Sequence, residues 1–156
     1  MKKLLLLSAF ILVSVAELSA QVEFKVITSV ESIVPNGLGR SRLISSNEDR
    51  DYSEFTSERS EDKDKDSRNK SKRDEIRVEN FEETKLLNFF NIGGIRFQNI
   101  AANDAVISSK INSMIEEGWE LAFVTSAVES DSGKGDGKGI FITRYIFKRL
   151  KSDSQS

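Results

Sequence analysis

Histidine and cysteine are absent from the 156 residues, and proline occurs once. Without histidine, Ser-His-Asp and Cys-His catalysis, the usual zinc catalytic sites and the common general base at neutral pH are excluded. Without cysteine, no disulfide can form, so the fold depends on burial alone. There is also no thiol that could accept an N-terminal lipid. The sequence therefore argues against most hydrolytic enzymes, and it predicts neither a cofactor nor a metal site.

The chain also lacks an excess of charge of either sign. Lysine and arginine number 23 and aspartate and glutamate 25, which gives a formal net charge of −2. A nucleic-acid-binding protein usually carries a strongly basic surface. We therefore expect no nucleic-acid partner.

The first twenty residues have the layout of a secretory signal peptide. Lys2 and Lys3 precede an apolar run over residues 4–16, and small residues follow at Ser19 and Ala20. We predict a signal peptide over 1–20 and a mature chain beginning at Gln21, with a cut after Ala16 as the alternative. Because the run is shorter than the ~20 residues of a membrane-spanning helix, we expect no membrane span after processing and a periplasmic or secreted protein.

A polar stretch interrupts the rest of the chain. Between Asn47 and Glu75 the only large apolar side chains are Tyr52 and Phe55. Such a segment buries too little surface to offset its ordering entropy. We predict a single α+β domain over 21–150 with a mobile, disordered charged excursion at 45–76, and a flexible tail at 151–156. The excursion is interpreted as a solvated loop, with a partner-binding arm as the alternative.

Strands are expected on both sides of this excursion. Apolar residues alternate with polar ones from Val22 to Glu31, which predicts a half-buried strand in which Ile27 is the exception on the polar face. A turn near Pro35 would lead to a short strand at 42–44 that pairs back as a hairpin. A further strand is predicted over 85–90 with Ile92.

One helix is expected after Asn103, which is a suitable N-cap. Gly118 is expected to end the helix in the left-handed conformation, so that Trp119 folds back onto Met114. The buried face of this helix is predicted to comprise Ile107, Ile111, Met114 and Ile115.

Two alternating runs after the helix predict a hairpin. Its helix-facing side is expected to carry Trp119, Leu121, Phe123, Thr125, Phe141, Thr143, Tyr145 and Phe147. The opposite side, with Ala122, Val124, Ile142 and Ile146, is more apolar than solvent favours, and the excursion or a second subunit would cover it. The predicted fold class is α+β: an antiparallel sheet of four or five strands with one helix packed on one face.

The segments 111–121 and 145–149 resemble those of a known protein family. Ile-Asn-Ser-Met-Ile-Glu-Glu-Gly-Trp-Glu-Leu, followed after the hairpin by Tyr-Ile-Phe-Lys-Arg, resembles a small bacterial domain-of-unknown-function family. The similarity covers 105–149 well and 24–27 loosely. It implies a strand-helix-strand-strand fold and no activity, since the family has no established chemistry to carry over.

Motifs that carry chemistry are few. Asp62, Asp64 and Asp66 begin like a calcium loop, but Ser67 stands where glycine is required and Arg73 where glutamate is required. The glycine-rich segment 133–139 lacks the spacing of a phosphate-binding loop, so it is interpreted as a hairpin connection.

Three residues are candidates for contact with an anion or a partner. Arg40 and Arg42 follow the permissive backbone of Gly37 and Gly39 and could hold a carboxylate, phosphate or sulfate, and Trp119 could touch a ligand. The structural alternatives are a solubilised turn for the arginines and a core position for Trp119. No catalytic residue is predicted, although the carboxylate pairs Glu116/Glu117 and Glu129/Asp131 keep a glycosidase-like alternative open.

The sequence therefore predicts an exported, non-catalytic binding or interaction domain with an unidentified protein or envelope partner. The alternatives are a small carboxylate-dependent hydrolase or carbohydrate-processing enzyme, and a self-associating envelope component that forms a homo-oligomer.

Overall fold

The computed structural model describes residues 21–32, 41–62, 66–91, 93–128 and 139–151. The predicted signal peptide, the turn near Pro35 and the tail beyond 151 lie outside these ranges. The main elements are the strands β1 (Val22–Ser32), β2 (Arg42–Ser46), β3 (Phe81–Lys85), β6 (Glu120–Val128) and β7 (Ile140–Leu150), and the helix α3 (Phe97–Glu116). The short elements are η2 (Tyr52–Phe55), α2 (Arg73–Ile76), β4 (Phe90–Asn91) and β5 (Gly94–Ile95).

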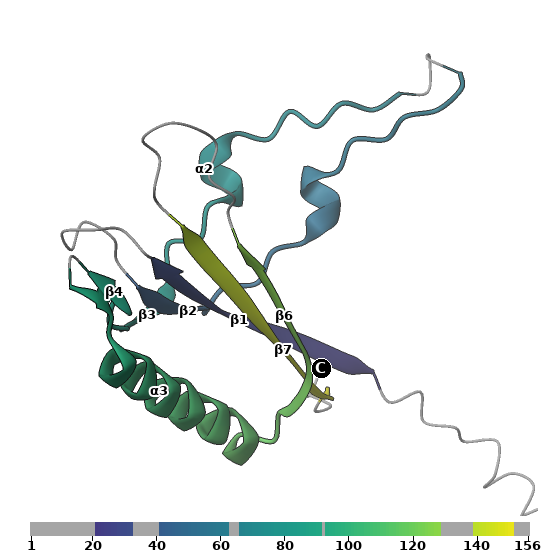
Figure 1. The fold of residues 1–156 in the computed structure, drawn as a ribbon. Helices are drawn as coiled ribbons and strands as arrows, with labels where there is room; N and C mark the ends of the chain where they lie inside the picture. Colours follow the sequence, from purple (N-terminus) through teal and green to yellow (C-terminus); the bar gives the residue numbers. More distant parts are fainter. Residues whose placement is uncertain (1–20, 33–40, 63–65, 92, 129–138, 152–156) are drawn as a thin grey trace, which may run out of the picture.

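The five long strands form one antiparallel sheet in the order β3-β2-β1-β7-β6, so β1 is the middle strand. Figure 1 shows α3 lying across one face of this sheet. The predicted fold class, α+β with one helix on one face of an antiparallel sheet, is confirmed. The predicted pairing of the strand at 42–44, which is part of β2, with β1 is also confirmed.

The end of α3 follows the prediction. Gly118 has a φ of +85°. Its N–H donates to the Ile115 carbonyl, and the N–H of Trp119 donates to the Met114 carbonyl, both at 2.9 Å. This pair of bonds satisfies carbonyls that a helix end leaves free, and it places Trp119 in the same buried cluster as Met114.

The start of α3 differs from the prediction. The helix begins at Phe97, so Asn103 is an interior residue and not the N-cap. Asn103 is buried, and its side chain accepts from the Leu87 N–H at 2.7 Å and donates to the Leu87 carbonyl at 2.8 Å. Its amide also donates to Glu31 at 3.1 Å. Asn103 therefore joins the helix to the segment that follows β3.

This contact also explains why the predicted strand over 85–90 is wrong. The Leu87 N–H donates to the Asn103 side chain and the Leu87 carbonyl accepts from it, so neither group is free for a strand ladder. The strand lies earlier, at Phe81–Lys85, where it pairs with β2. Phe90–Asn91 and Gly94–Ile95 form a separate small hairpin.

The face of β1 that meets the helix is the reverse of the expected one. Ile27 and Ser29 are buried, at 2% and 1% exposure, whereas Phe24 is 65% exposed. The alternation correctly predicted a strand, but α3 covers the more polar side. The core on the helix side consists of Ile27, Leu43, Leu86, Ile107, Met114, Trp119 and Phe147. Ile115, expected in it, is 53% exposed because it lies about 100° around the helix from Met114.

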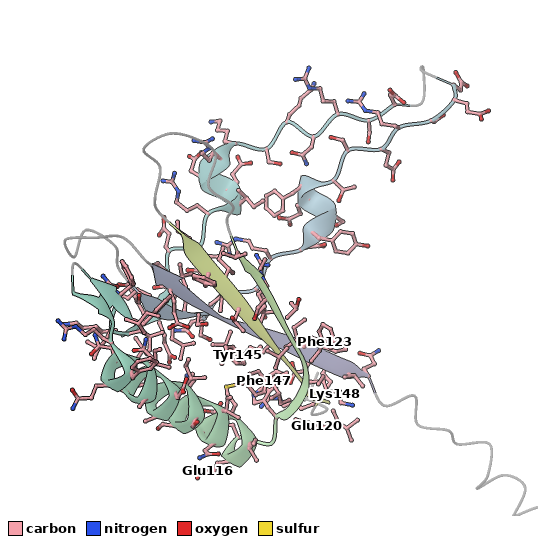
Figure 2. All side chains as sticks on the ribbon, in the orientation of Figure 1. Glu116, Glu120, Phe123, Tyr145, Phe147 and Lys148 are labelled. Carbon is pink, nitrogen blue, oxygen red and sulfur yellow. The ribbon has the colours of Figure 1, made fainter. Side chains whose placement is uncertain are left out.

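A bulge in β6 changes the sides of the hairpin. The pairing with β7 shifts between Leu121 and Phe123, so Phe123 pairs with Ile146 and Val124 with Tyr145. The extra residue reverses which positions face the helix. Phe123 and Thr125 therefore lie on the side away from α3, and Val124 lies on the helix side, contrary to the prediction. Phe147 and Tyr145 face the helix as expected (Figure 2).

The charged excursion leaves the sheet between β2 and β3 and projects away from it (Figure 1). Its base is closed by a backbone bond from the Asn47 N–H to the Asn80 carbonyl at 3.1 Å and by Arg50, which donates to the Arg77 carbonyl at 2.7 Å. Farther out, the Ser67 N–H donates to the Glu58 carbonyl at 3.2 Å. The two arms thus run back along each other without a buried apolar residue in η2 or α2.

Candidate functional site

The side of the sheet away from α3 is the most distinctive surface of the described residues. We call it the open sheet face and define it by the apolar residues Val22, Phe24, Val26, Val30, Ile44, Phe123, Ile142 and Ile146. Val26, Ile146 and Phe123 form one row across β1, β7 and β6 because these residues are direct partners in the strand ladders. Four different strands therefore contribute to one apolar surface.

The aromatic and β-branched side chains on this face are accessible to solvent. Phe24 is 65% exposed, Phe123 61% and Val26 44%. Residues 46–50, where the excursion leaves the sheet, line a cleft together with Phe24 and Val26, but both side chains stay exposed. The excursion and a second subunit were the two expected coverings for the apolar side of the sheet. The excursion leaves these residues open. Contiguous apolar patches of this kind mark interaction sites on soluble proteins.

Charged residues on the open sheet face are largely paired within the chain. Lys148 lies 3.3 Å from Glu120, and the Arg42 guanidinium contacts the Glu83 carboxylate. Arg144 stands opposite Thr28 and Thr125 in the ladders. The row of Val26, Ile146 and Phe123 carries no charge, but Lys148 and Arg144 lie on either side of Ile146 along β7, and Arg144 has no ion pair among the described residues.

The helix-facing side of the same sheet is more polar. Ser29, Ser41, Ser45 and Asn103 are buried there. The Ser41 hydroxyl donates to Asn88 at 2.8 Å, whereas the Ser45 hydroxyl has no hydrogen-bond partner among the described residues. Burial raises the pKa of Tyr145, whose ring lies among the residues packed against the core. The protein thus buries hydroxyls under its helix and exposes phenylalanines on the opposite side.

Trp119, the first candidate contact residue, is 7% exposed. The Arg149 guanidinium carbon lies 4.2 Å from the centroid of its ring, and Arg149 also pairs with Glu23 at 2.5 Å. Trp119 is therefore packed between the core and an arginine that a carboxylate holds in place. Its remaining exposed edge borders a cleft of about 470 Å³ between the start of β1 and residues 46–50.

The two candidate arginines fall in different situations. Arg42 lies on the sheet, where it contacts Glu83 and donates to the Ser41 carbonyl at 2.8 Å. An incoming anion would have to compete with Glu83 for this guanidinium. Arg40 lies outside the described residues, so the predicted pair is not placed together.

The acidic groups give little support to catalysis by carboxylates. Glu48 borders the cleft beside Trp119, and its bonds from Arg50 and from the Asn80 backbone lower its pKa. A carboxyl with a lowered pKa is ionised at neutral pH and is a poor general acid. Glu116 and Glu117 are exposed at the end of α3, and Glu129 and Asp131 lie outside the described residues.

The rejected calcium and phosphate motifs contribute no site to the described ranges. Asp66 accepts from the Ser60 N–H at 2.8 Å and pairs with Arg59 at 3.1 Å, while Asp64 and residues 133–138 lie outside those ranges. Among the described residues, no group of three acidic side chains is arranged to hold a metal ion. None of the helices in that part of the chain is both long and apolar enough to cross a membrane.

Sequence reasoning identified Ile142 and Ile146 as apolar positions away from the helix, but it missed Phe24, Val26 and Phe123. The alternation of β1 marked its apolar side without showing which side the helix would cover.

Comparison with known proteins finds no matching family model, no matching curated protein and no matching solved structure.

Proposed function

We propose that this protein is an exported, non-catalytic binding domain that holds an apolar partner surface against its open sheet face. The observation that carries the proposal is the exposure of Phe24 and Phe123, at 65% and 61%, on the open sheet face, where Phe123 continues the uncharged row of Val26 and Ile146. Full burial of one large apolar side chain contributes about 1.5–3 kcal/mol. A partner that covers Phe24, Val26 and Phe123 would therefore gain several such contributions from a surface that is already formed.

A binding role agrees with the chemistry of the chain better than the carboxylate-enzyme alternative. An enzyme of that kind needs an acid whose pKa is raised toward neutrality. Glu48, which borders the cleft beside Trp119, has a lowered pKa instead. The open sheet face is broad and carries an exposed apolar row across three strands, which suits contact with another macromolecule.

The exported location is part of the proposal, and it rests on the pattern of residues 1–20. N-terminal sequencing of the protein purified from its producing cells should give a chain that begins at Gln21, or at Glu17 if the alternative cut is used. Recovery of Met1 from a membrane fraction would contradict export in processed form.

The binding surface can be tested by photo-crosslinking in the producing cells. Benzoylphenylalanine would replace Phe123 on the open sheet face or, as the matched control, Phe97, which is 76% exposed at the start of α3. We expect a discrete adduct from position 123 that is absent from position 97. Equal adduct patterns at the two positions, or none at position 123, would contradict the proposal.

A further inference from the structure

We propose that the partner attaches by adding an extended segment of its own chain, which carries an acidic residue, to the free edge of β6 as a further strand of the sheet. This inference rests on the proposed binding role of the open sheet face and names how the partner is held. Three features of the described residues carry it: the unprotected edge of β6, the direction of its backbone groups and the charge of Arg144.

The two edges of the sheet differ in how they are protected. β3, at one edge, carries Glu82, Glu83 and Lys85 within its five residues. Charged side chains of this kind discourage a further strand from pairing with an edge. β6, at the other edge, has nine residues and a single charge, on Glu120 at its start (Figure 1). After the bulge its pairing with β7 is regular, so the stretch 123–128 presents an unprotected edge.

The stretch 123–128 is also bare on both faces. Phe123, on the open sheet face, is 61% exposed, and Val124 and Val128, on the helix side, are 44% and 57% exposed. α3 therefore leaves this part of the strand uncovered. Side chains of these types stabilise a sheet by packing against neighbours on the adjacent strand. A strand added beside β6 would supply such neighbours on both faces.

The backbone groups at this edge select an extended chain as the occupant. The Lys151 N–H donates to the Gln21 carbonyl at 2.7 Å, so this pair is a hydrogen-bonded pair at the end of the ladder between β1 and β7. Because such pairs alternate along antiparallel strands, Arg144 directs its backbone groups toward its partner Thr125 in β6. Every second residue of β6 then points its N–H and C=O away from the sheet. Only an extended chain presents donors and acceptors at that spacing. The outward-pointing groups belong to Val124, Ser126 and Val128.

Arg144 determines the charge of the added segment. It is exposed, has no ion pair among the described residues, and lies on the open sheet face beside the small side chain of Thr125. The position opposite Thr125 on an added strand is two strand spacings, about 10 Å, from β7. An arginine and a glutamate side chain together span that distance, so we expect an acidic residue at this position of the partner. A second copy of β6 does not supply it, because β6 contains no acidic residue after its bulge.

The experiment measures amide hydrogen exchange of the isotope-labelled chain by NMR, with and without a designed probe. The probe is a blocked nine-residue peptide of alternating valine and threonine with a glutamate at its centre. We expect the N–H groups of Val124, Ser126 and Val128 to exchange fast in the free chain and at least about tenfold more slowly with the peptide. Thr125 and Ala127, which point toward β7, should exchange slowly in both samples.

Ser126→Pro tests the contribution of the backbone. It removes an outward N–H and leaves the ladder with β7 intact, which an edge strand tolerates. We expect it to weaken peptide binding about tenfold or more. Ser126→Ala is the matched control, because it loses the same hydroxyl contact with Thr143 and keeps the N–H, so it should bind like the wild type. Slow exchange at Thr125 and Ala127 shows that each variant is folded.

A charge exchange tests the contribution of Arg144. Replacing the central glutamate of the peptide by lysine should weaken binding to the wild type about fivefold. Arg144→Glu should reverse this preference, so that the lysine peptide binds better than the glutamate peptide. A preference that Arg144→Glu does not reverse would overturn the assignment of an acidic partner.

Two further results would overturn the strand addition. The first is fast exchange of the outward N–H groups at about 1 mM peptide, or binding that Ser126→Pro leaves unchanged. The second is slow exchange of these groups in the peptide-free chain that strengthens with its concentration, because a second copy would then occupy the edge.

The crosslinking of position 123 tests the proposed function separately. An adduct from that position without protection of the outward N–H groups keeps the binding role and overturns only the strand addition. The absence of an adduct overturns the binding role itself.

Discussion

Replacement of Trp119 by alanine tests how the helix end and the sheet are held together. Trp119 is 7% exposed, belongs to the core cluster and lies under Arg149, whose guanidinium carbon is 4.2 Å from the ring centroid. Removal of a buried large aromatic costs about 3–5 kcal/mol. The contact with Arg149 adds about 0.5–1 kcal/mol at most, because Arg149 itself is partly exposed.

That loss is a large part of the 5–15 kcal/mol by which a domain is typically stable. At about 4 °C per kcal/mol for a chain of this size, we expect the melting temperature to fall by roughly 12–20 °C. Trp119→Phe keeps an aromatic ring in the core and should lose less than half as much. Phe97→Ala, at a position that is 76% exposed, serves as the control and should change little.

Thermal unfolding followed by circular dichroism at one fixed protein concentration gives the comparison. The concentration is fixed because association would shift the melting temperature by mass action. A fall of less than about 4 °C for Trp119→Ala, equivalent to ~1 kcal/mol, would refute a core role. In that case Trp119 would be free to act as a contact residue at the cleft.

Three further predictions concern other parts of the chain. Asn103→Ala should destabilise the protein by about 1–3 kcal/mol in urea titrations, because it removes the two hydrogen bonds that the buried Asn103 amide makes with the Leu87 backbone; equal urea midpoints for variant and wild type would contradict this. Glu48 has a lowered pKa in the folded chain, so its contribution to stability is present above its unfolded pKa and is lost as the pH falls through its folded pKa. Urea midpoints at pH 7 and pH 3 should therefore differ less for Glu48→Gln than for the wild type, and an unchanged difference would show that the contacts of Glu48 with Arg50 and Asn80 do not stabilise the fold. Limited proteolysis should cut first within 58–73 and leave the strands intact, whereas slow amide exchange throughout that segment would show that it is an integral element.

Local signals predicted the elements whose structure depends on neighbouring residues. Gly118 could be identified as the helix end because a left-handed residue followed by an apolar contact is a short-range pattern. The pairing of β6 with β7 was likewise visible as two alternating runs close together in the chain. These predictions needed no knowledge of distant parts of the fold.

The errors arose where distant contacts decide the structure. The bulge at Leu121/Phe123 moves Phe123 to the open face, and a period-two pattern does not reveal an inserted residue. Asn103 resembles an N-cap in sequence, but its side chain is used by Leu87, which is 16 residues away. The side of β1 that meets the helix depends on where α3 packs, so the open sheet face could be predicted only in part.

The central claim is that the open sheet face is covered when the protein functions. Hydroxyl-radical footprinting measures this directly by comparing side-chain oxidation in intact producing cells with that of the dilute purified protein. We predict that Phe24 and Phe123 are protected in cells and reactive in dilute solution, while Phe97 is reactive in both. Equal oxidation of Phe24 and Phe123 in the two conditions would contradict the claim that this face binds a partner.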